Sequence, residues 1–287
     1  MKFSSPRCLG LTLLMGTALL TAAPQAGPVA GEVLAAHRDQ FQLEVALDGT
    51  DGAQTVFVGP GDAAIAEPGD AFRGRLVRQG PNWRLETIFP AEPHAVGQIE
   101  RLGSELQRDT LRRGRKAFRA VGERIPVFAL WDQNGDLFHS ESLKGRYAVI
   151  NFIFSRCAVQ TMCPASTARM IELAEAVKER GWEDVRLVSI TLDPAYDTPG
   201  IWTAYAEAKG IDGALHALLG GPPETVDALK KQMGVLAEPD PQQIVRHTMS
   251  TALVDPTGKI IYRLPGSMWR PETFLEEIAE ARTQTGS

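Results

Sequence analysis

Hydrophobic and polar positions divide the chain into stretches with different periods. Residues 27–93 contain short runs in which apolar and polar residues partly alternate, such as QFQLEVALD and AQTVFVGP, separated by turns rich in Gly, Pro and Asp. Partial alternation between turn residues is typical of short strands, about five in this stretch. The pattern therefore predicts a small all-β domain over residues 27–93, either an OB-like barrel or a half-open sandwich.

The next stretch, residues 94–121, has a helical period. Ile99, Leu102, Leu106 and Leu111 recur near one face of a helix. Its second half is basic, with Arg112, Arg113, Arg115, Lys116 and Arg119. We interpret it as a solvated basic helical linker. Docking of this linker on an acidic partner or an anionic membrane surface is the alternative.

Residues 122–287 alternate between strand and helix patterns. YAVINFIFS and VRLVSITLD are nearly unbroken apolar runs, as expected of strands covered on both faces, and a helical pattern follows each. Hairpins are expected around Asn134-Gly135 and around Asp255–Gly258, and a helical pattern closes the chain. A hairpin, a βαβ unit, a second hairpin and a last helix follow the order of a thioredoxin-like fold. The predicted fold class is α/β, a thioredoxin-like domain preceded by a small all-β (OB-like) domain.

The first 26 residues read as a signal peptide. Lys2 and Arg7 give a positive start, CLGLTLLMGTALLTAA an apolar run, and Thr21-Ala22-Ala23 small residues for cleavage. The run is short for a membrane span, which needs about 20 residues. We therefore expect a periplasmic or secreted protein, and an uncleaved segment would associate it with a membrane.

Charge and cysteine content narrow the function classes. The net charge of −5 is mild, with basic and acidic residues intermixed, so we expect no nucleic-acid partner. Cys8 would leave with the signal peptide, and Cys157 and Cys163 would remain in a disulfide-permissive compartment. One local pair cannot be the framework of a disulfide-stapled fold.

Cys157 and Cys163 stand where α/β proteins gather ligands. Cys157 follows the predicted strand, and Cys163 precedes a helix that Pro164 opens. A thiolate at a helix N-terminus is stabilised by the macrodipole, so its pKa should fall. Both thiols are therefore predicted to be reactive or metal-binding.

Three chemistries remain open for this pair. The loop is long enough to close into a disulfide for thiol–disulfide exchange. Zinc is less favoured, because structural zinc sites use four ligands and the chain has few histidines. Two soft thiolates with one imidazole suit copper, and His247, after the polar loop LAEPDPQQIVR, could supply the imidazole. Met162 and Met249 adjoin these residues and could add a soft contact, although packing is their more common role.

Three segments, in this order along the chain, resemble segments of a known protein family. INFIFSRCAVQTMCP, LVSITLDPAYDTPGIWTAYAEAKG and VRHTMSTALVDPTGKIIYRLP resemble the Sco/SenC family, over roughly residues 122–285. These are thioredoxin-like copper-binding proteins that serve assembly of the dinuclear copper site of cytochrome c oxidase. The resemblance implies that Cys157 and Cys163 are copper ligands and redox cysteines, that His247 is the third ligand, and that the cofactor is a copper ion, Cu(I) or Cu(II). The chain departs from the family in placing five residues, instead of three, between the cysteines.

The family's aspartate-rich stretch maps onto Asp193 and Asp197. The resemblance allows these carboxylates to orient His247 as partners behind the metal ligands. A turn with a helix cap, provided by Asp197 or Thr198 before Pro199, explains the same residues equally well.

The leading hypothesis is a copper metallochaperone. It would deliver copper to an oxidase subunit, or first reduce that subunit's cysteines, so its partners are a copper-accepting oxidase subunit and a thiol–disulfide exchange partner. The main alternative is a periplasmic thiol–disulfide oxidoreductase that uses Cys157 and Cys163 as catalytic residues without metal, which leaves open whether the protein is an enzyme. A permanent Cys157–Cys163 staple is a third hypothesis. A peroxiredoxin-like activity fits less well, because Thr161 and Arg156 are near but the motif order differs.

Overall fold

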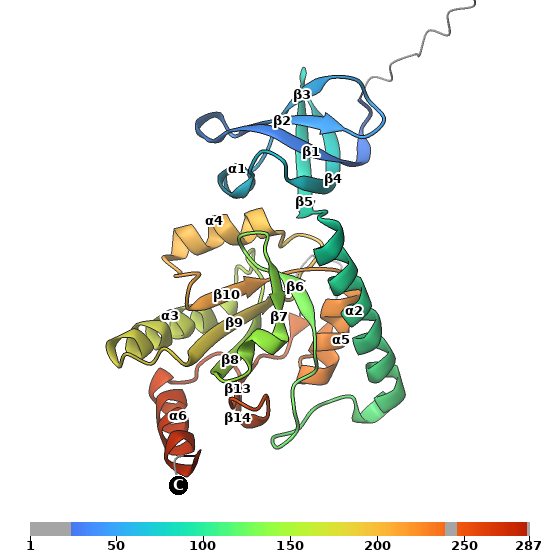
Figure 1. Ribbon diagram of the computed structural model, residues 1–287. Helices are drawn as coiled ribbons and strands as arrows, with labels where there is room; N and C mark the ends of the chain where they lie inside the picture. The colour runs from blue at the N-terminus through green and yellow to red at the C-terminus, as the bar shows by residue number, and fades with distance from the viewer. Residues whose placement is uncertain (1–23, 239–245, 286–287) are drawn as a thin grey trace, which may run out of the picture.

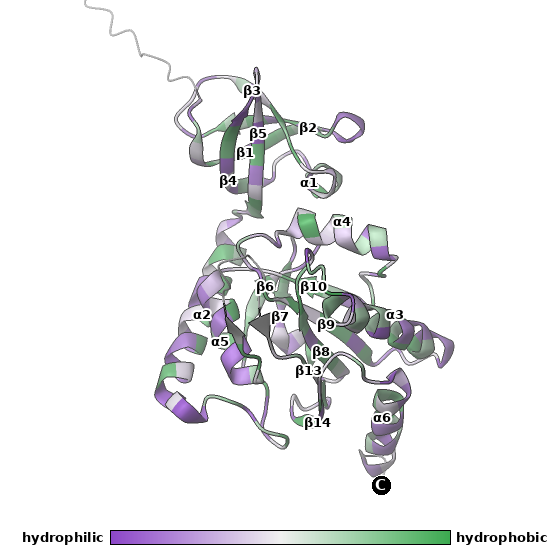
Figure 2. Ribbon diagram, turned by 180° about the vertical axis from the view of Figure 1, so that it is seen from behind, coloured by the Kyte–Doolittle hydropathy of each residue, from purple (hydrophilic) through white to green (hydrophobic). Residues whose placement is uncertain are grey.

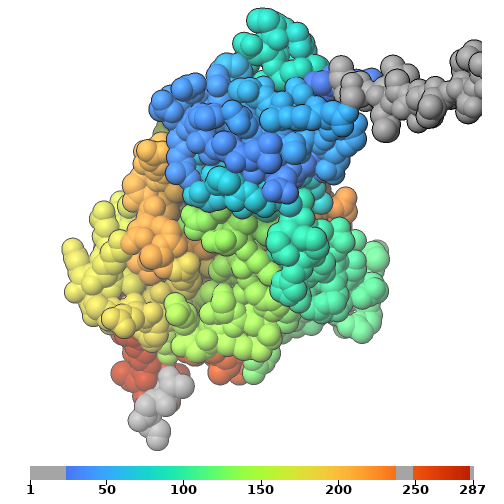
Figure 3. All heavy atoms as spheres, turned by 45° about the horizontal axis from the view of Figure 1, so that its top comes forward, coloured from blue at the N-terminus to red at the C-terminus, as the bar shows by residue number. Residues whose placement is uncertain are grey.

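The computed structural model describes residues 24–238 and 246–285. The predicted signal peptide, residues 1–26, lies almost wholly outside this range, as does most of the polar loop before His247. The described chain forms a β barrel that is seated on a larger α/β domain (Figures 1 and 3). Within the described residues, no helix is both long enough and apolar enough to cross a membrane.

The first domain is a closed barrel in the strand order β1-β2-β3-β5-β4. Its elements are β1 (Gly27–His37), the 3-10 turn η1 (Arg38–Gln40), β2 (Gln42–Leu47), β3 (Ala53–Phe57), α1 (Pro60–Ile65), β4 (Ala71–Gln79) and β5 (Asn82–Pro90). β1 pairs with β2 along one edge and with β4 along the other, which closes the barrel. In β2, Leu43, Val45 and Leu47 point inward and are buried, because side chains in a strand alternate between faces.

The helix after the barrel, α2 (Pro93–Arg113), packs on the second domain beside α5 (Pro223–Met233). Ile99, Leu102 and Leu106 share one face, as predicted, and the structure shows that this face is buried. Leu111, however, is 81% exposed, so its assignment to the same face was wrong. Five residues turn a helix by about 140° beyond a full turn, which carries Leu111 away from the face of Leu106.

The basic end of α2 is partly neutralised by an internal carboxylate. Asp109 forms ion pairs with Arg112 at 2.8 Å, Arg113 at 3.2 Å and Arg119 at 2.9 Å. Gln232 of α5 also donates to Asp109, at 3.0 Å. Side-chain contacts therefore fix α2 to α5, although the outer face of α2 is strongly hydrophilic (Figure 2).

The second domain is built on a five-stranded sheet in the order β10-β9-β8-β13-β14. β8, β9 and β10 are parallel, and β13 and β14 are antiparallel to their neighbours. The remaining elements are η2 (Gly114–Lys116), β6 (Ala129–Trp131), β7 (Leu137–His139), η3 (Ser140–Leu143), β8 (Tyr147–Ile153), α3 (Cys163–Glu179), β9 (Val185–Thr191), α4 (Pro199–Lys209), β10 (His216–Leu219), β11 (Ala237–Glu238), β12 (Arg246–His247), β13 (Ser250–Val254), β14 (Ile260–Pro265) and α6 (Pro271–Thr285).

Both faces of this sheet are covered. In β8 every residue is buried, and alternate side chains enter two separate cores. Tyr147 and Val149 pack with α3 and α6, whereas Ile150 and Phe152 pack with α4, α5 and the β6–β7 hairpin. Strands covered on both faces need continuous apolar sequence, which is why this run was recognisable. The predicted fold class, a thioredoxin-like domain after a small OB-like domain, is confirmed.

Glycines bring the two domains into close contact. Gly61 of α1 lies against Gly200 of α4, so closely that a side-chain carbon at Gly61 would collide with the Gly200 carbonyl. At the tip of the β6–β7 hairpin, Gly135 has a φ of +80° and faces Pro90 at the end of β5. These two contacts lie where the barrel meets the second domain, and Figure 3 shows the barrel seated on that domain.

Candidate metal centre

The two cysteines lie at the carboxyl end of the central strand. β8 ends at Ile153, a loop carries Cys157, and α3 begins at Cys163. Cys157 is partly exposed and Cys163 is 1% exposed, and neither forms a disulfide. The two side chains are hydrogen-bonded to each other. The structure therefore brings together the two sulfurs that the sequence proposed as ligands.

The Cys163 thiol does not behave as its place at a helix start suggested. Burial raises its pKa above the ordinary value, and the neighbouring Cys157 and Asp197 raise it further, against a lowering hydrogen bond from the Phe154 backbone. The expectation of a lowered pKa is therefore wrong for Cys163. Desolvation disfavours the thiolate by more than the helix terminus stabilises it. A metal at this site has to displace the proton.

Asp197 anchors the start of the cysteine loop. Its fully buried carboxylate accepts hydrogen bonds from the Ser155 hydroxyl at 2.5 Å and the Thr191 hydroxyl at 2.6 Å. The Ser155 backbone N–H also points to it, at 3.3 Å. Burial raises the pKa of Asp197 to about 6, although these hydrogen bonds lower it. The cap of α4 is Thr198, whose hydroxyl accepts from the Ile201 N–H.

Asp193 holds the same loop from outside. Its carboxylate pairs with Arg156 at 2.6 Å, and the Arg156 guanidinium lies 4.5 Å from the ring centre of Tyr196. Arg156 directly precedes Cys157. Both aspartates therefore contact residues next to the thiols, whereas their predicted role in orienting His247 stays a prediction.

Two further contacts lie close to the thiols, and no sequence motif indicated either of them. Ser267, in the segment after β14, donates to the Thr161 carbonyl at 2.5 Å and so fixes the far end of the cysteine loop. Tyr205 of α4 shares a hydrogen bond of 2.9 Å with Thr167 of α3, and its pKa is raised mainly by burial and also by the nearby thiols. Ser267 lies 106 residues from Thr161 along the chain, so spacing gives no signal for the contact.

Comparison with known proteins decides the family. The SCO1/SenC family model matches residues 119–283, more than half of the chain. The chain belongs to the SCO1/SenC family. Residues 119–283 are called the SCO1/SenC domain below, and the barrel precedes it.

Individual relatives agree with this assignment. The SCO1 protein homolog of Bacillus subtilis is 31% identical over 163 residues, which cover 55% of this chain and 83% of that protein. The SCO2-like protein RC0895 of Rickettsia conorii is 32% identical over 139 residues, covering 47% of this chain and 65% of the relative. The match thus spans just under two thirds of the Rickettsia protein.

Solved structures are also similar. A SCO1/SenC family lipoprotein from Bacillus anthracis aligns with a TM-score of 0.51 and 28% identity, covering 57% of this chain and 98% of that chain. BsSco, described with a disulfide switch as a member of the Sco family of cytochrome c oxidase assembly proteins, aligns with a TM-score of 0.50 and 25% identity, covering 57% and 96%.

The third predicted ligand is described only in its backbone. His247 lies in β12 of the SCO1/SenC domain, where it pairs with Ala237 of β11. Its side chain, and the loop of residues 239–245, lie outside the described residues. Among the side chains that are described, no group of three His, Cys, Asp or Glu is close enough to hold a metal ion. The predicted set of Cys157, Cys163 and His247 therefore stays a prediction.

The two methionines near the predicted ligands differ in exposure. Met162 caps the start of α3 and is partly exposed, whereas Met249 is buried and its carbonyl accepts from the Gly266 N–H. The burial of Met249 agrees with a packing role.

Replacing Asp197 with alanine tests its function as an anchor. At neutral pH we expect Asp197→Ala to lower the free energy of unfolding by about 3 kcal/mol, because the donors of Ser155 and Thr191 lose their acceptor in a buried site. Urea denaturation of the reduced protein measures this loss.

Asp193→Ala is the matched control. It removes an ion pair whose Arg156 side chain is 42% exposed, so we expect a change of about 1 kcal/mol or less. Equal losses in the two variants would contradict the anchoring function of Asp197.

Proposed function

We propose that this protein is a copper metallochaperone that binds one copper ion through Cys157, Cys163 and His247. The observation that carries the proposal is the pair of reduced, hydrogen-bonded thiols at the carboxyl end of β8. Two thiolates and an imidazole form a soft donor set that suits Cu(I). Closing the pair into a disulfide removes two ligands at once, so copper binding requires the reduced form.

Relatives support copper as the ion and an oxidase as the destination. A Stutzerimonas stutzeri protein with the name "Putative copper-binding protein" is 33% identical over 142 residues, and these cover 47% of this chain and 66% of that protein. BsSco belongs, by its description, to a family of cytochrome c oxidase assembly proteins. We propose a copper-accepting oxidase subunit as the partner and a periplasmic or secreted location for this protein. An uncleaved N-terminal segment would add membrane association.

Copper titration with a histidine variant tests the proposal. The reduced protein is expected to bind one equivalent of Cu(I), and His247→Ala to lower the affinity by about two to three orders of magnitude, because one of three ligands is lost. Competition with a chromophoric Cu(I) chelator measures the affinity. His94→Ala, at an exposed position at the start of α2, is the control and should bind like the parent protein. Full affinity in His247→Ala would contradict the proposed ligand set.

Thiol–disulfide exchange is the second candidate function. Cys157 is partly exposed and Cys163 is buried, so Cys157 is the sulfur that a partner's disulfide can reach. Its thiolate would attack that disulfide and release one partner thiolate. Cys163 would then attack the mixed disulfide, leaving the partner as a dithiol and Cys157–Cys163 oxidised. This exchange does not need His247, so a His247→Ala variant with full exchange activity and weak copper binding separates the two functions.

A further inference from the structure

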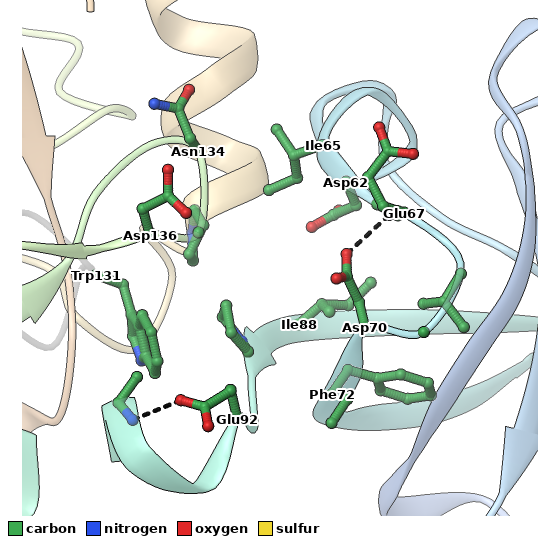
Figure 4. A pocket seen from close by; sticks show the side chains of 18 of the residues that line it. Asp62, Ile65, Glu67, Asp70, Phe72, Ile88, Glu92, Trp131, Asn134 and Asp136 are labelled. Carbon is green, nitrogen blue, oxygen red and sulfur yellow. Dashed lines mark hydrogen bonds between the residues drawn. The ribbon is translucent and has the colours of Figure 1, made fainter. Parts of the chain in front are cut away.

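A cavity of about 730 Å³ lies between the barrel and the SCO1/SenC domain, away from the cysteine loop. Its walls come from α1, β4, β5 and the start of α2 on one side, and from the β6–β7 hairpin and the start of α4 on the other (Figure 4). Its volume is in the range of pockets that hold small molecules, which gather at domain interfaces. The glycine contacts between α1 and α4, and between the hairpin and β5, join the two walls of this space.

The lining combines apolar walls with negative charge. The apolar walls include Val33, Ile65, Phe72, Ile88, Trp131 and Leu137. Five carboxylates line the same space, namely Asp62, Glu67, Asp70, Glu92 and Asp136. Among the described residues that line it, none is a lysine or an arginine. The cavity therefore attracts positive charge.

Three of these carboxylates are already engaged, and one of them is Asp70, which accepts from the Glu67 backbone N–H at 2.7 Å. Glu67 pairs with Arg38 at 2.5 Å, and Glu92 caps α2 by accepting from the His94 and Ala95 N–H groups. Their charges are used within the protein, so they are not the main attraction for a ligand.

Asp62 is the least exposed of the five carboxylates, and its carboxylate also lies against the backbone of Gly59 and Gly200. Figure 4 shows it directed into the space, with Trp131 and Asp136 across from it. Burial raises the pKa of Asp62 to about 6, against lowering by the Gly59 backbone and by the charge of Arg84. Its hydrogen bond comes from the Gly59 backbone, and a buried carboxylate is costly until a positive group compensates it.

A bare metal ion does not fit this charge. Within the described residues, no three carboxylate, histidine or cysteine groups converge closely enough to hold a metal ion. The walls between the carboxylates are apolar and aromatic, so they favour contact with the hydrocarbon part of an organic ligand. An aromatic ring such as that of Trp131 also attracts a cation at its face.

We propose that this interdomain cavity binds a small organic cation, an ammonium or guanidinium group on an apolar body, with Asp62 as its main counter-charge. The apolar body packs against Phe72, Ile88 and Trp131. Because both domains line the cavity, the bound cation bridges them. This binding is independent of the thiols, and it gives the barrel a function that the copper proposal does not explain.

The test uses probes that share a shape and differ in charge. Phenethylammonium, neutral 2-phenylethanol and anionic 3-phenylpropionate are titrated into the purified full chain, and the indole N–H resonance of Trp131 is followed by NMR. We expect phenethylammonium to bind in one equivalent, at least roughly tenfold tighter than 2-phenylethanol, and 3-phenylpropionate not to bind. Trp131→Phe identifies the resonance.

Three variants make the outcome decisive. Asp62→Asn should remove the preference for the cation, and Ile65→Trp should fill the cavity and abolish binding of both probes. Asp48→Asn, at an exposed turn of the barrel, should bind like the parent protein, and thermal melts confirm that each variant is folded. Equal affinity for the cation and the neutral probe, unchanged binding in Asp62→Asn, or no binding of the cation at millimolar concentration would each overturn the proposal.

Discussion

Replacing Cys163 with serine is expected to lower the affinity for Cu(I) by about a thousandfold. Binding energies of sites made by three or four protein ligands are about 10–16 kcal/mol, as measured for zinc. The loss of one of three ligands should therefore cost on the order of 4 kcal/mol, which is about three orders of magnitude in affinity. A serine hydroxyl is a hard donor and does not replace a thiolate for Cu(I). Chelator competition under anaerobic, reducing conditions measures the change.

Serine substitutions at the two cysteine positions should differ in their effect on stability, although we expect both to lower copper affinity. Cys163 is buried in the core, where a serine hydroxyl lacks a matched environment, whereas Cys157 is partly exposed. We expect Cys157→Ser to lower copper affinity as much as Cys163→Ser, with a smaller loss of unfolding free energy. If either serine variant keeps the parent affinity, the two-thiolate site is wrong. A thermal melt that shows folded protein excludes unfolding as the cause of a lowered affinity.

Apolar periodicity together with turn residues predicted most elements of the second domain, because its strands are covered on both faces, whereas the short β11–β12 pair was not predicted. The run at β8 could be recognised since all seven of its residues are buried. The barrel was foreseeable in kind from its turn residues, whereas closure of β1 onto β4 depends on pairing between distant strands. The prediction for Leu111 was wrong because a single exposed apolar residue near the end of α2 made the helical pattern look longer than the buried face is.

The candidate site shows the same division between local and distant contacts. Cys157 and Cys163 were recognisable from their position between a strand and a proline-started helix. The anchoring of their loop was not, because Asp197 reaches Ser155 across 42 residues and Ser267 reaches Thr161 across 106. The pKa of Cys163 was predicted in the wrong direction, since sequence shows the helix start but not the burial of the thiol.

A second large effect is expected from a histidine inside the sheet. His216 of β10 is 1% exposed, and its Nε2 lies 2.8 Å from the Ser189 hydroxyl. That hydroxyl donates to the Asn151 carbonyl oxygen, and the Asn151 amide donates to Ser166 at the start of α3. Because Ser189 has already used its proton, it accepts from Nε2–H, and His216 is the neutral tautomer with a bare Nδ1. That Nδ1 is buried without a hydrogen-bond partner among the described residues.

Protonation of this ring would place a charge where nothing accepts its new N–H. Burial, aided by the charge of Arg186, lowers the pKa of His216 from its ordinary 6.5 to about 3. Between pH 6.5 and pH 3 the unfolded state therefore binds more protons than the folded state, so stability falls as the pH falls through this window. At about pH 4.5 the loss from His216 alone should be about 3 kcal/mol relative to neutral pH.

Carboxylates with a raised pKa act in the opposite direction, and Asp62 and Asp197 have the largest shifts among them. Burial raises the pKa of Asp62 and of Asp197 to about 6, so between pH 4 and pH 6 the folded state binds more protons at these groups. Their contribution to stability is present at low pH and is lost as the pH rises through about 6. The total stability curve therefore mixes opposing slopes, and only a comparison of variants isolates the histidine.

His216→Gln provides that comparison, because its amide can still donate to Ser189 but does not titrate. We expect the difference in unfolding free energy between His216→Gln and the parent protein to shift by about 3 kcal/mol in favour of the variant from pH 7 to pH 4.5, as measured by urea denaturation. His94→Gln, an exposed position, should shift by a few tenths of a kcal/mol at most. Parallel pH profiles for His216→Gln and the parent protein would show that the folded state protonates His216 as readily as the unfolded chain, against the structure of the buried network.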